Sequence, residues 1–319
     1  NLRWARDRST AEFLASVENC RAVKMGLVAQ VAQSYFELMA LDNELAIVRR
    51  TLEARREGVR LAEIRFKGGL TSEIVFQQAK VELAKTATMV PDLERRISLK
   101  ESEIALLTGD FPYAVNRNIL PEEIQLPDAL PLGLPSTLLE RRPDIRKAER
   151  ELMAAHAEVG LAYTNMFPRL ALTATLGTES ETLRDFLKSP YSYLAGNLLS
   201  PLFAMGKNRA ALKAKRAAYE GAVAEYEQTV LTAFKETHDA IINFNKIKDI
   251  YESRRQLAEA SRTAVELAQL QYINGVIGYL DLLDAQRNYF DAQVSLSNAV
   301  CNKQLMIINL YKALGGGWK

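Results

Sequence analysis

Residues 53–74 read EARREGVRLAEIRFKGGLTSEI, and residues 259–280, which lie 206 positions later, read EASRTAVELAQLQYINGVIGYL. Such similarity at a fixed offset indicates that one structural unit occurs twice in the 319-residue chain. In each copy a run of good helix formers ends at a glycine-containing turn, Gly68-Gly69 or Asn274-Gly275, and a second helical run follows. Glycine supplies the positive φ that a short connection between antiparallel helices needs. The repeat therefore predicts two long helical hairpins.

The positions of the prolines indicate how long these helices are. None of the ten prolines precedes Pro91 or follows Pro201, so residues 3–66 and 207–271 contain none. One helix over either stretch would be roughly 95 Å long at ~1.5 Å per residue. Apolar residues at alternating spacings of three and four predict supercoiled packing of these helices. The predicted seams are Phe13, Val17, Cys20, Leu27 and Val31 in the first stretch, and Tyr219, Val223, Tyr226, Val230, Ala233, Thr237, Ala240 and Phe244 in the second.

The segment between the two copies follows a different pattern. Six prolines fall within residues 112–143, and a helix is expected next. From Pro168 onward, apolar and polar residues alternate, which predicts a strand of about ten residues. A second strand is expected from about Tyr191 to Phe203. This length suits a tilted membrane-spanning strand and equally a strand in water. The apolar face of the first strand consists of Leu170, Leu172, Ala174 and Leu176.

The same offset of 206 places an equivalent of this strand pair just upstream of Asn1. We therefore expect that the chain lacks an N-terminal portion containing a first strand pair. Two strands with exposed edges need partners for their backbone groups. Further strands, from the same protein or from other subunits, are expected to complete the sheet.

The composition excludes several classes of protein. The chain has 41 basic and 39 acidic residues, a balance that does not suit nucleic-acid binding, and 48% apolar residues, too many for a disordered chain. Two cysteines cannot form a disulfide framework, and two histidines exclude a histidine-rich metal site. No apolar run approaches the ~18 residues of a membrane-spanning helix. No phosphate loop, nucleophile elbow or metal-ligand spacing occurs, so we expect no enzyme, cofactor or metal.

Short motifs spread along the chain permit a more specific comparison. They are Gly133–Ser136, Leu138–Ile145, Phe167-Pro168, Leu202–Gly206, Leu282–Arg287 and Leu310–Trp318. In this order they resemble the TolC-like outer-membrane factor family, and most closely its lipoprotein-type members, the exit ducts of tripartite RND multidrug efflux systems. The resemblance implies a homotrimer in the outer membrane of a Gram-negative bacterium, with most of the chain in the periplasm. It also implies contact with outer-membrane lipid, a periplasmic adaptor (membrane fusion protein) and an inner-membrane RND-type pump.

The fold class that follows is mainly α with a small β part. Long antiparallel coiled-coil helices would form a trimeric α-barrel, and the β-hairpin would contribute to a trimeric outer-membrane β-barrel. Residues 1–110 would be the first-repeat helical hairpin, with its tip near 67–72, and residues 111–145 a proline-rich equatorial segment. Residues 146–166 would form a helix leading to the barrel, and residues 167–205 its β-hairpin. Residues 206–319 would be the second-repeat hairpin, with its tip near 273–278 and a C-terminal equatorial end.

Two acidic residues after the second turn are candidates for a gate. Asp281 and Asp284, at i and i+3, share one helix face, although acids near a helix start also compensate the helix dipole. From sequence alone, compensation of the helix dipole explains the two acids at least as well as a gate does. The resemblance implies that three copies form an acidic ring that narrows the periplasmic aperture. Ile277 stands where the family often has a basic locking residue, and Arg287 is a candidate substitute.

The turns themselves are a second candidate site, because apolar residues at an exposed turn indicate a partner surface. The resemblance implies that these tips meet the adaptor. The residues concerned are Gly68, Gly69, Leu70, Thr71, Ser72, Gly275, Val276, Ile277 and Gly278. By contrast, Arg141-Arg142-Pro143-Asp144 is interpreted as structural, because proline and an acid both suit a helix start.

The expected function is passive conduction of drugs or other small molecules out of the periplasm, gated at the tips and driven by the inner-membrane pump. A duct for type I protein secretion remains an alternative. A periplasmic adaptor would need β-rich lipoyl-type halves around one hairpin, whereas this chain has two hairpins without them. A coiled-coil scaffold without a pore is a further alternative.

Overall fold

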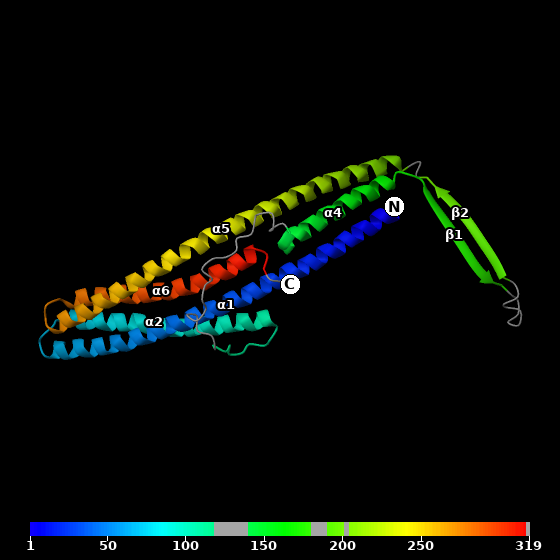
Figure 1. Cartoon of the computed structure of the whole chain (residues 1–319). Coiled ribbons are helices and arrows are strands. Elements are labelled where there is room, and N and C mark those ends of the chain that lie inside the picture. Colours follow the sequence, from blue (N-terminus) through cyan, green and yellow to red (C-terminus); the bar gives the residue numbers. More distant parts are fainter. Residues whose placement is uncertain (118–139, 180–189, 201–203, 317–319) are drawn as a thin grey trace. The chain divides into compact units, whose positions relative to one another are not determined.

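The computed structural model describes residues 1–117, 140–179, 190–200 and 204–316. In these residues five helices and one β-hairpin occur (Figure 1), which confirms the predicted mainly helical fold with one strand pair. No helix in the described parts of the chain is both long enough and apolar enough to cross a membrane. In chain order, the elements are α1 (Leu2–Lys67), α2 (Glu73–Thr108), α4 (Pro143–Thr164), β1 (Arg169–Thr178), β2 (Pro190–Leu199), α5 (Met205–Ile273) and α6 (Tyr279–Ala313).

The chain divides into two compact units. One comprises Asn1–Arg21 and Pro143–Thr232, and therefore contains α4, the β-hairpin and the first parts of α1 and α5. The other comprises Ala22–Arg142 and Ala233–Lys319, and contains both helical hairpins with their turns.

The two hairpins have the same backbone geometry at their turns and at the C-terminal ends of α2 and α6. Leu70 donates its N–H to the Arg65 carbonyl at 2.8 Å, and 206 positions later Val276 donates to Gln271 at 2.9 Å. The glycines of these turns, Gly69 and Gly275, have φ values of +70° and +74°, which other residues rarely adopt. The ends of α2 and α6 repeat one another too, because Asp110 donates to Ala105 and Gly316 to Tyr311, both at 2.9 Å. The predicted repeat is therefore confirmed in three dimensions.

An apolar cluster holds α1 against α2 in the unit that contains the turns. It includes Leu38, Leu41, Leu45 and Val48 of α1, at spacings of three and four, and Leu93, Ile97 and Ile104 of α2. Leu38 and Val48 are fully buried. The spacing keeps one face of α1 on its partner, as in a supercoiled pair.

The two predicted seams differ in outcome. Every residue of the α5 seam is buried or half-buried, including Ala233, Thr237 and Ala240. The α1 seam is wrong in part, because Phe13, Cys20 and Leu27 are exposed. The residues buried on this half of α1 are mainly small, namely Ala11, Ala15, Ala29 and Ser34.

The unit with the strands has a small aromatic contact between its helices. The Trp4 ring of α1 lies against Gly160 of α4, where an added Cβ would overlap it. The β-hairpin is antiparallel, pairing Arg169 with Leu199 and Thr178 with Pro190. The second strand ends at Leu199 rather than Phe203, and residues 201–203 lie outside the described residues.

Candidate functional site

The helical turns expose most of the apolar residues that the sequence singled out. Leu70 and Val276 are 73% and 70% exposed and occupy equivalent positions of the two copies. The four glycines and Ser72 are exposed, and Thr71 is half-buried. Ile277 differs, because it is half-buried and packs on the cluster of Ala268, Tyr272 and Leu282. The apolar surface of each turn therefore centres on Leu70 or Val276.

The two acidic gate candidates have different local roles. Asp281 accepts a hydrogen bond from the Gly278 N–H at 3.0 Å, so it caps the start of α6. Asp284 is 73% exposed in its side chain, and its nearest cation is Arg287, 3.7 Å away. The Asp284 side chain is therefore mostly exposed, whereas Asp281 is held to the start of α6.

Arg287 joins the two hairpins through a carboxylate that the sequence had not singled out. Its guanidinium donates to Glu82 of α2, whose side chain is only 6% exposed. Arg55 of α1 donates to the opposite oxygen of the same carboxylate at 3.0 Å, to the Glu82 carbonyl at 2.8 Å and to the Thr86 hydroxyl at 2.5 Å. One buried carboxylate thus connects α1, α2 and α6. We call Arg55, Glu82 and Arg287 the inter-hairpin triad.

Electrostatics keep this triad ionised. The hydrogen bond from Arg287 is the largest effect on Glu82 and, with Lys85 and the charge of Arg55, holds the pKa of the carboxyl below its ordinary value. Burial lowers the pKa of Arg55 below its ordinary value, and the charge of Glu82 opposes this shift. The bond to Glu82 raises the pKa of Arg287. Because desolvated charges are stable only when paired, Arg55 and Glu82 depend on each other, whereas Arg287 is 44% exposed.

A second contact between the hairpins lies nearer the turns. Arg65 of α1 donates to the carbonyl of Tyr272 in α5 at 3.2 Å, and its guanidinium lies 4.7 Å from the centre of the Tyr272 ring. Tyr272 in turn contacts the ring of Tyr279, with centroids 5.9 Å apart. Burial raises the pKa of Tyr279, which keeps its hydroxyl neutral.

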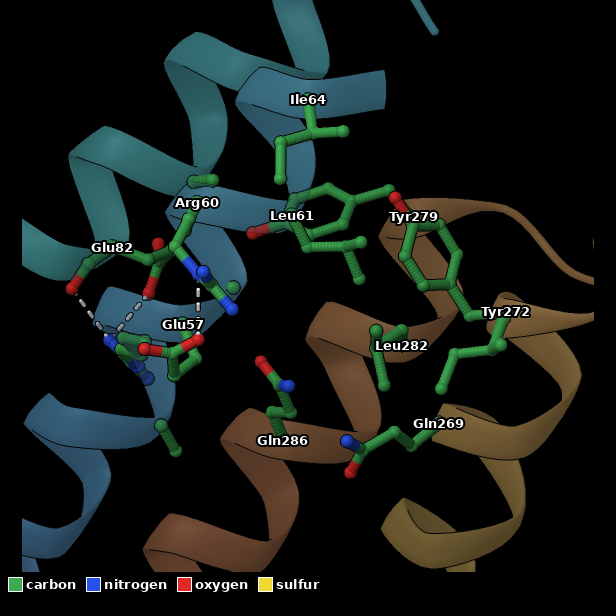
Figure 2. A pocket seen from close by; sticks show the side chains of 15 residues that line it. Glu57, Arg60, Leu61, Ile64, Glu82, Gln269, Tyr272, Tyr279, Leu282 and Gln286 are labelled. Atoms are coloured by element: carbon green, nitrogen blue, oxygen red, sulfur yellow. Dashed lines mark hydrogen bonds and ion pairs between the residues drawn. The ribbon is translucent and has the colours of Figure 1, made fainter. Parts of the chain in front are cut away.

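A cavity of about 260 Å³ lies beside these contacts, between the two hairpins. Figure 2 shows Glu57, Arg60, Leu61 and Ile64 of α1 on one side, with side chains of α5 and α6 opposite. Arg60 donates to Glu57 at 3.0 Å, so that pair is self-contained. Among the described residues, no group of three or more His, Cys, Asp or Glu side chains could hold a metal ion.

The remaining predicted residues do not belong to the turns. Arg142 is 5% exposed, and it donates to the Ala313 carbonyl at 3.3 Å and to Glu236 at 2.6 Å, so it ties the end of α6 to α5. Pro143 begins α4 and Asp144 lies in its first turn, whereas Arg141 is exposed. Leu170, Leu172, Ala174 and Leu176 are all exposed, and so are Ala171, Thr173 and Thr175 on the other face. Gly133–Ser136, Leu138-Leu139, Leu202-Phe203 and Gly317-Trp318 lie outside the described residues.

Comparison with known proteins decides the family. Residues 1–110 and 134–316 match the family described as outer membrane efflux protein. The chain belongs to the outer membrane efflux protein family. The predicted family and the outer-membrane location in Gram-negative bacteria are thereby confirmed, and this family consists of channel proteins rather than enzymes. The membership favours an outer-membrane duct over the adaptor and the scaffold alternatives.

Individual members of the outer membrane efflux protein family agree in both sequence and fold. Outer membrane protein OprJ of Pseudomonas aeruginosa is 35% identical over 98% of this chain, and solvent efflux pump outer membrane protein SrpC of Pseudomonas putida is 33% identical over 99%. The chain spans 66% of the length of OprJ and 68% of that of SrpC. The solved outer-membrane channel OprN has a TM-score of 0.88 at 30% identity, covering 99% of this chain and 72% of its own.

Proposed function

We propose that this protein is one subunit of a homotrimeric exit duct that conducts drugs or other small molecules from the periplasm to the outside. The observation that carries the proposal is the pair of equivalent turns, each exposing an apolar residue at the same repeat position, at the ends of two long helical hairpins. Membership of the efflux family supports it, and OprJ and SrpC are named as outer membrane proteins, SrpC as a component of a solvent efflux pump.

The proposal assigns a place to each segment. Residues 1–110 and 206–316 form the periplasmic α-barrel of three subunits. Of the segment 111–145 and the C-terminal end, which the sequence assigns to an equatorial belt, residues 118–139 and 317–319 lie outside the described residues. Residues 146–166 lead to residues 167–205, whose hairpin joins an outer-membrane β-barrel with Leu170, Leu172, Ala174 and Leu176 toward lipid. Ten paired residues are enough for a tilted strand to cross the membrane.

The gate in this proposal lies at the turns. Asp284, with Asp281 beside it, supplies an acidic ring when three copies meet, and such a ring favours cations and repels anions. The inter-hairpin triad and the Arg65–Tyr272 contact hold the second hairpin against the first, so they stabilise the closed arrangement. Arg287 acts here through Glu82 of its own chain, which accounts for a lock without a basic residue at Ile277.

The gate is tested by conductance of the full-length protein in lipid bilayers. Asp284→Ala should raise the leak current, and Asp281→Ala/Asp284→Ala should raise it further. Because Asp281 also caps α6, the single Asp284 variant separates charge from helix capping. Asp249→Ala on α5, another exposed acid, is the matched control and should leave the current unchanged. An unchanged current in both Asp284 variants would remove these residues from the gate.

Docking of a periplasmic adaptor is tested at the turns. A photoreactive amino acid at Leu70 or Val276 should cross-link to the adaptor of a cognate tripartite pump in cells. Leu231, 64% exposed on α5, is the control position and should give no such product. Equal yields at all three positions would count against docking at the turns.

A further inference from the structure

The strand pair and the start of α5 differ sharply in charge. Residues 170–178 and 190–206 contain no charged side chain. The first charges toward the helices are both basic, Arg169 at the start of β1 and Lys207 in the first turn of α5. From Lys207 to Arg216, five residues of α5 are basic and none is acidic. Uncharged strands therefore adjoin a helical segment whose charges are all positive.

Hydrogen bonds at Asn165 hold the ends of these elements together. Asn165 lies between α4 and β1, and its side chain accepts a hydrogen bond from Arg169 of β1. Its backbone carbonyl accepts another from the side chain of Asn208 in α5 at 3.0 Å. The end of α4, the base of the strand pair and the start of α5 therefore meet at one level of their unit, and the basic segment begins at this level.

Four of the five basic residues have no partner in the described part of the chain. The fifth, Lys215, pairs with Glu158 of α4 at 2.5 Å, and Arg8 of α1 approaches the same carboxylate at 3.6 Å. Glu158 is the last acid of α4, so that helix has no further acid toward the strands. The other four are exposed and make no ion pair or side-chain hydrogen bond with a described residue; they are Lys207, Arg209, Lys213 and Arg216.

Three of these unpaired bases lie on one face of α5. Arg209, Lys213 and Arg216 are spaced at i, i+4 and i+7, which places them along one side of the helix. Like charges at such spacings repel one another and destabilise a helix. Side chains on a helix lean toward its N-terminus, and the N-terminus of α5 adjoins the strand pair, so all three lean toward the base of the strands. An anionic surface at that level would relieve their repulsion.

Exposed aromatic side chains lie at the same level. Tyr163 in the last turn of α4 and Phe167, just before β1, are 50% and 49% exposed, and their ring centroids are 5.2 Å apart. Aromatic residues are enriched where a membrane protein passes from the hydrocarbon to the headgroups. Exposed uncharged strands, exposed aromatic rings and unpaired bases thus follow one another in the order of hydrocarbon, interface and headgroup phosphates.

We propose that Arg209, Lys213 and Arg216, with Lys207 beside them, bind the phosphate groups of anionic phospholipid in the periplasmic leaflet of the outer membrane. Guanidinium and ammonium groups donate charge-assisted hydrogen bonds to phosphate oxygens. A headgroup such as glycerol keeps the negative charge of the phosphate, whereas choline cancels it. Binding fixes the depth at which the strand pair enters the membrane. This inference rests on the proposed function, in which the strand pair enters the outer membrane.

Native mass spectrometry of the full-length protein in detergent measures this binding. The probes are phosphatidylglycerol and phosphatidylcholine with the same acyl chains, so that only the headgroup charge differs. Arg209→Gln/Lys213→Gln/Arg216→Gln removes three charges and keeps good helix formers at exposed positions. Arg209→Lys/Lys213→Arg/Arg216→Lys changes the same three side chains and keeps their charge.

The matched control removes three charges elsewhere. Arg96→Gln/Lys248→Gln/Arg254→Gln alters bases that are also exposed and also lack an ion pair with any described residue, but that belong to the unit with the turns. Any general effect of net charge on lipid binding is therefore the same in this control as in the glutamine variant of α5.

The expected results separate headgroup binding from general partitioning. The unmodified protein should bind phosphatidylglycerol at least tenfold more tightly than phosphatidylcholine, because each base near anionic lipid strengthens binding about fivefold before screening. The glutamine variant of α5 should lose this preference, and the charge-keeping variant and the control should retain it. No preference in the unmodified protein, or an equal loss in the glutamine variant and the control, would overturn the proposal.

Three further outcomes have a defined meaning. Glycerol phosphate at the same concentration should not displace the lipid, and displacement would indicate a site for a soluble phosphate compound instead. If only the glutamine variant of α5 loses the oligomer, a neighbouring copy contacts these bases and the lipid site is wrong. Lipid preference without any channel current would refute the proposed function and leave binding itself intact, whereas normal current without the preference would refute the lipid site alone.

Discussion

The inter-hairpin triad makes a quantitative prediction about Glu82. Glu82→Ala removes a carboxylate that is 6% exposed and leaves Arg55, 10% exposed, without its counter-charge. Removing one partner of a buried ion pair costs about 3–5 kcal/mol. Arg55 keeps the backbone carbonyl of residue 82 and the Thr86 hydroxyl as acceptors, so the lower end, about 3 kcal/mol, applies. Arg287 and Lys85 are 44% and 64% exposed, and each loses less than about 1 kcal/mol.

Hydrogen–deuterium exchange of the full-length protein measures this local effect without requiring reversible global unfolding. A loss of about 3 kcal/mol corresponds to roughly 100-fold faster exchange, since about 1.4 kcal/mol is a factor of ten. The acceleration is expected in peptides covering residues 53–62 and 79–90. Glu94→Ala, which breaks the exposed α1–α2 pair with Arg49 at 2.7 Å, is the control and should change exchange by less than about fivefold.

The reasoning also predicts rescue. Arg55→Leu/Glu82→Leu replaces the buried pair with apolar side chains, a change that is often neutral, so exchange should return close to the original rate. Exchange in Glu82→Ala no faster than in Glu94→Ala would refute the argument that an uncompensated buried charge destabilises the hairpins.

Three further predictions concern pH, packing and thiol chemistry. The pKa of Glu82 is lower in the folded protein than its ordinary 4.5, so its contribution is present above pH 4.5 and is lost as the pH falls through the folded value. The ratio of exchange rates between Glu82→Gln and the unmodified protein should therefore shrink below pH 4.5, and a constant ratio would contradict this. Gly160→Ala should destabilise its unit by about 1–3 kcal/mol because the new methyl overlaps Trp4, whereas Gly221→Ala on α5 has open space and should stabilise it slightly; thermal unfolding distinguishes the two. Burial raises the pKa of Cys301 to about 11, so iodoacetamide at pH 8 should label the exposed Cys20 first, and equal labelling by mass spectrometry would contradict the burial.

Sequence reasoning predicted those features of the fold that depend on a few neighbouring residues. Glycine at a turn, a proline-free run and period-two alternation each act within a few residues, so the hairpins and the first strand were predictable. The α1 seam was not, because the spacing of large apolar residues does not mark the contact face there. Small residues such as Ala11, Ala15 and Ala29 let helices approach closely and are buried instead, while Phe13 faces outward.

The triad shows why the site was harder to predict. Arg287 and Glu82 are 205 residues apart, and nothing in the local pattern of either helix indicates that their faces meet. A signal did exist in the repeat. At the offset of 206, Arg55 aligns with Ser261 and Glu82 with Asn288. The second copy therefore lacks two of the charges that form the triad. A charged residue in one copy that aligns with an uncharged residue in the other was therefore the sequence signal for this site.

The central claim, that this protein forms a duct, is tested most directly by single-channel recording of the full-length protein in planar lipid bilayers. We predict discrete unitary current steps with a preference for cations over anions, and a reduced preference in Asp284→Asn, because each subunit would contribute one exposed carboxylate to the aperture. Bilayers that contain the protein but show no unitary steps would contradict the claim.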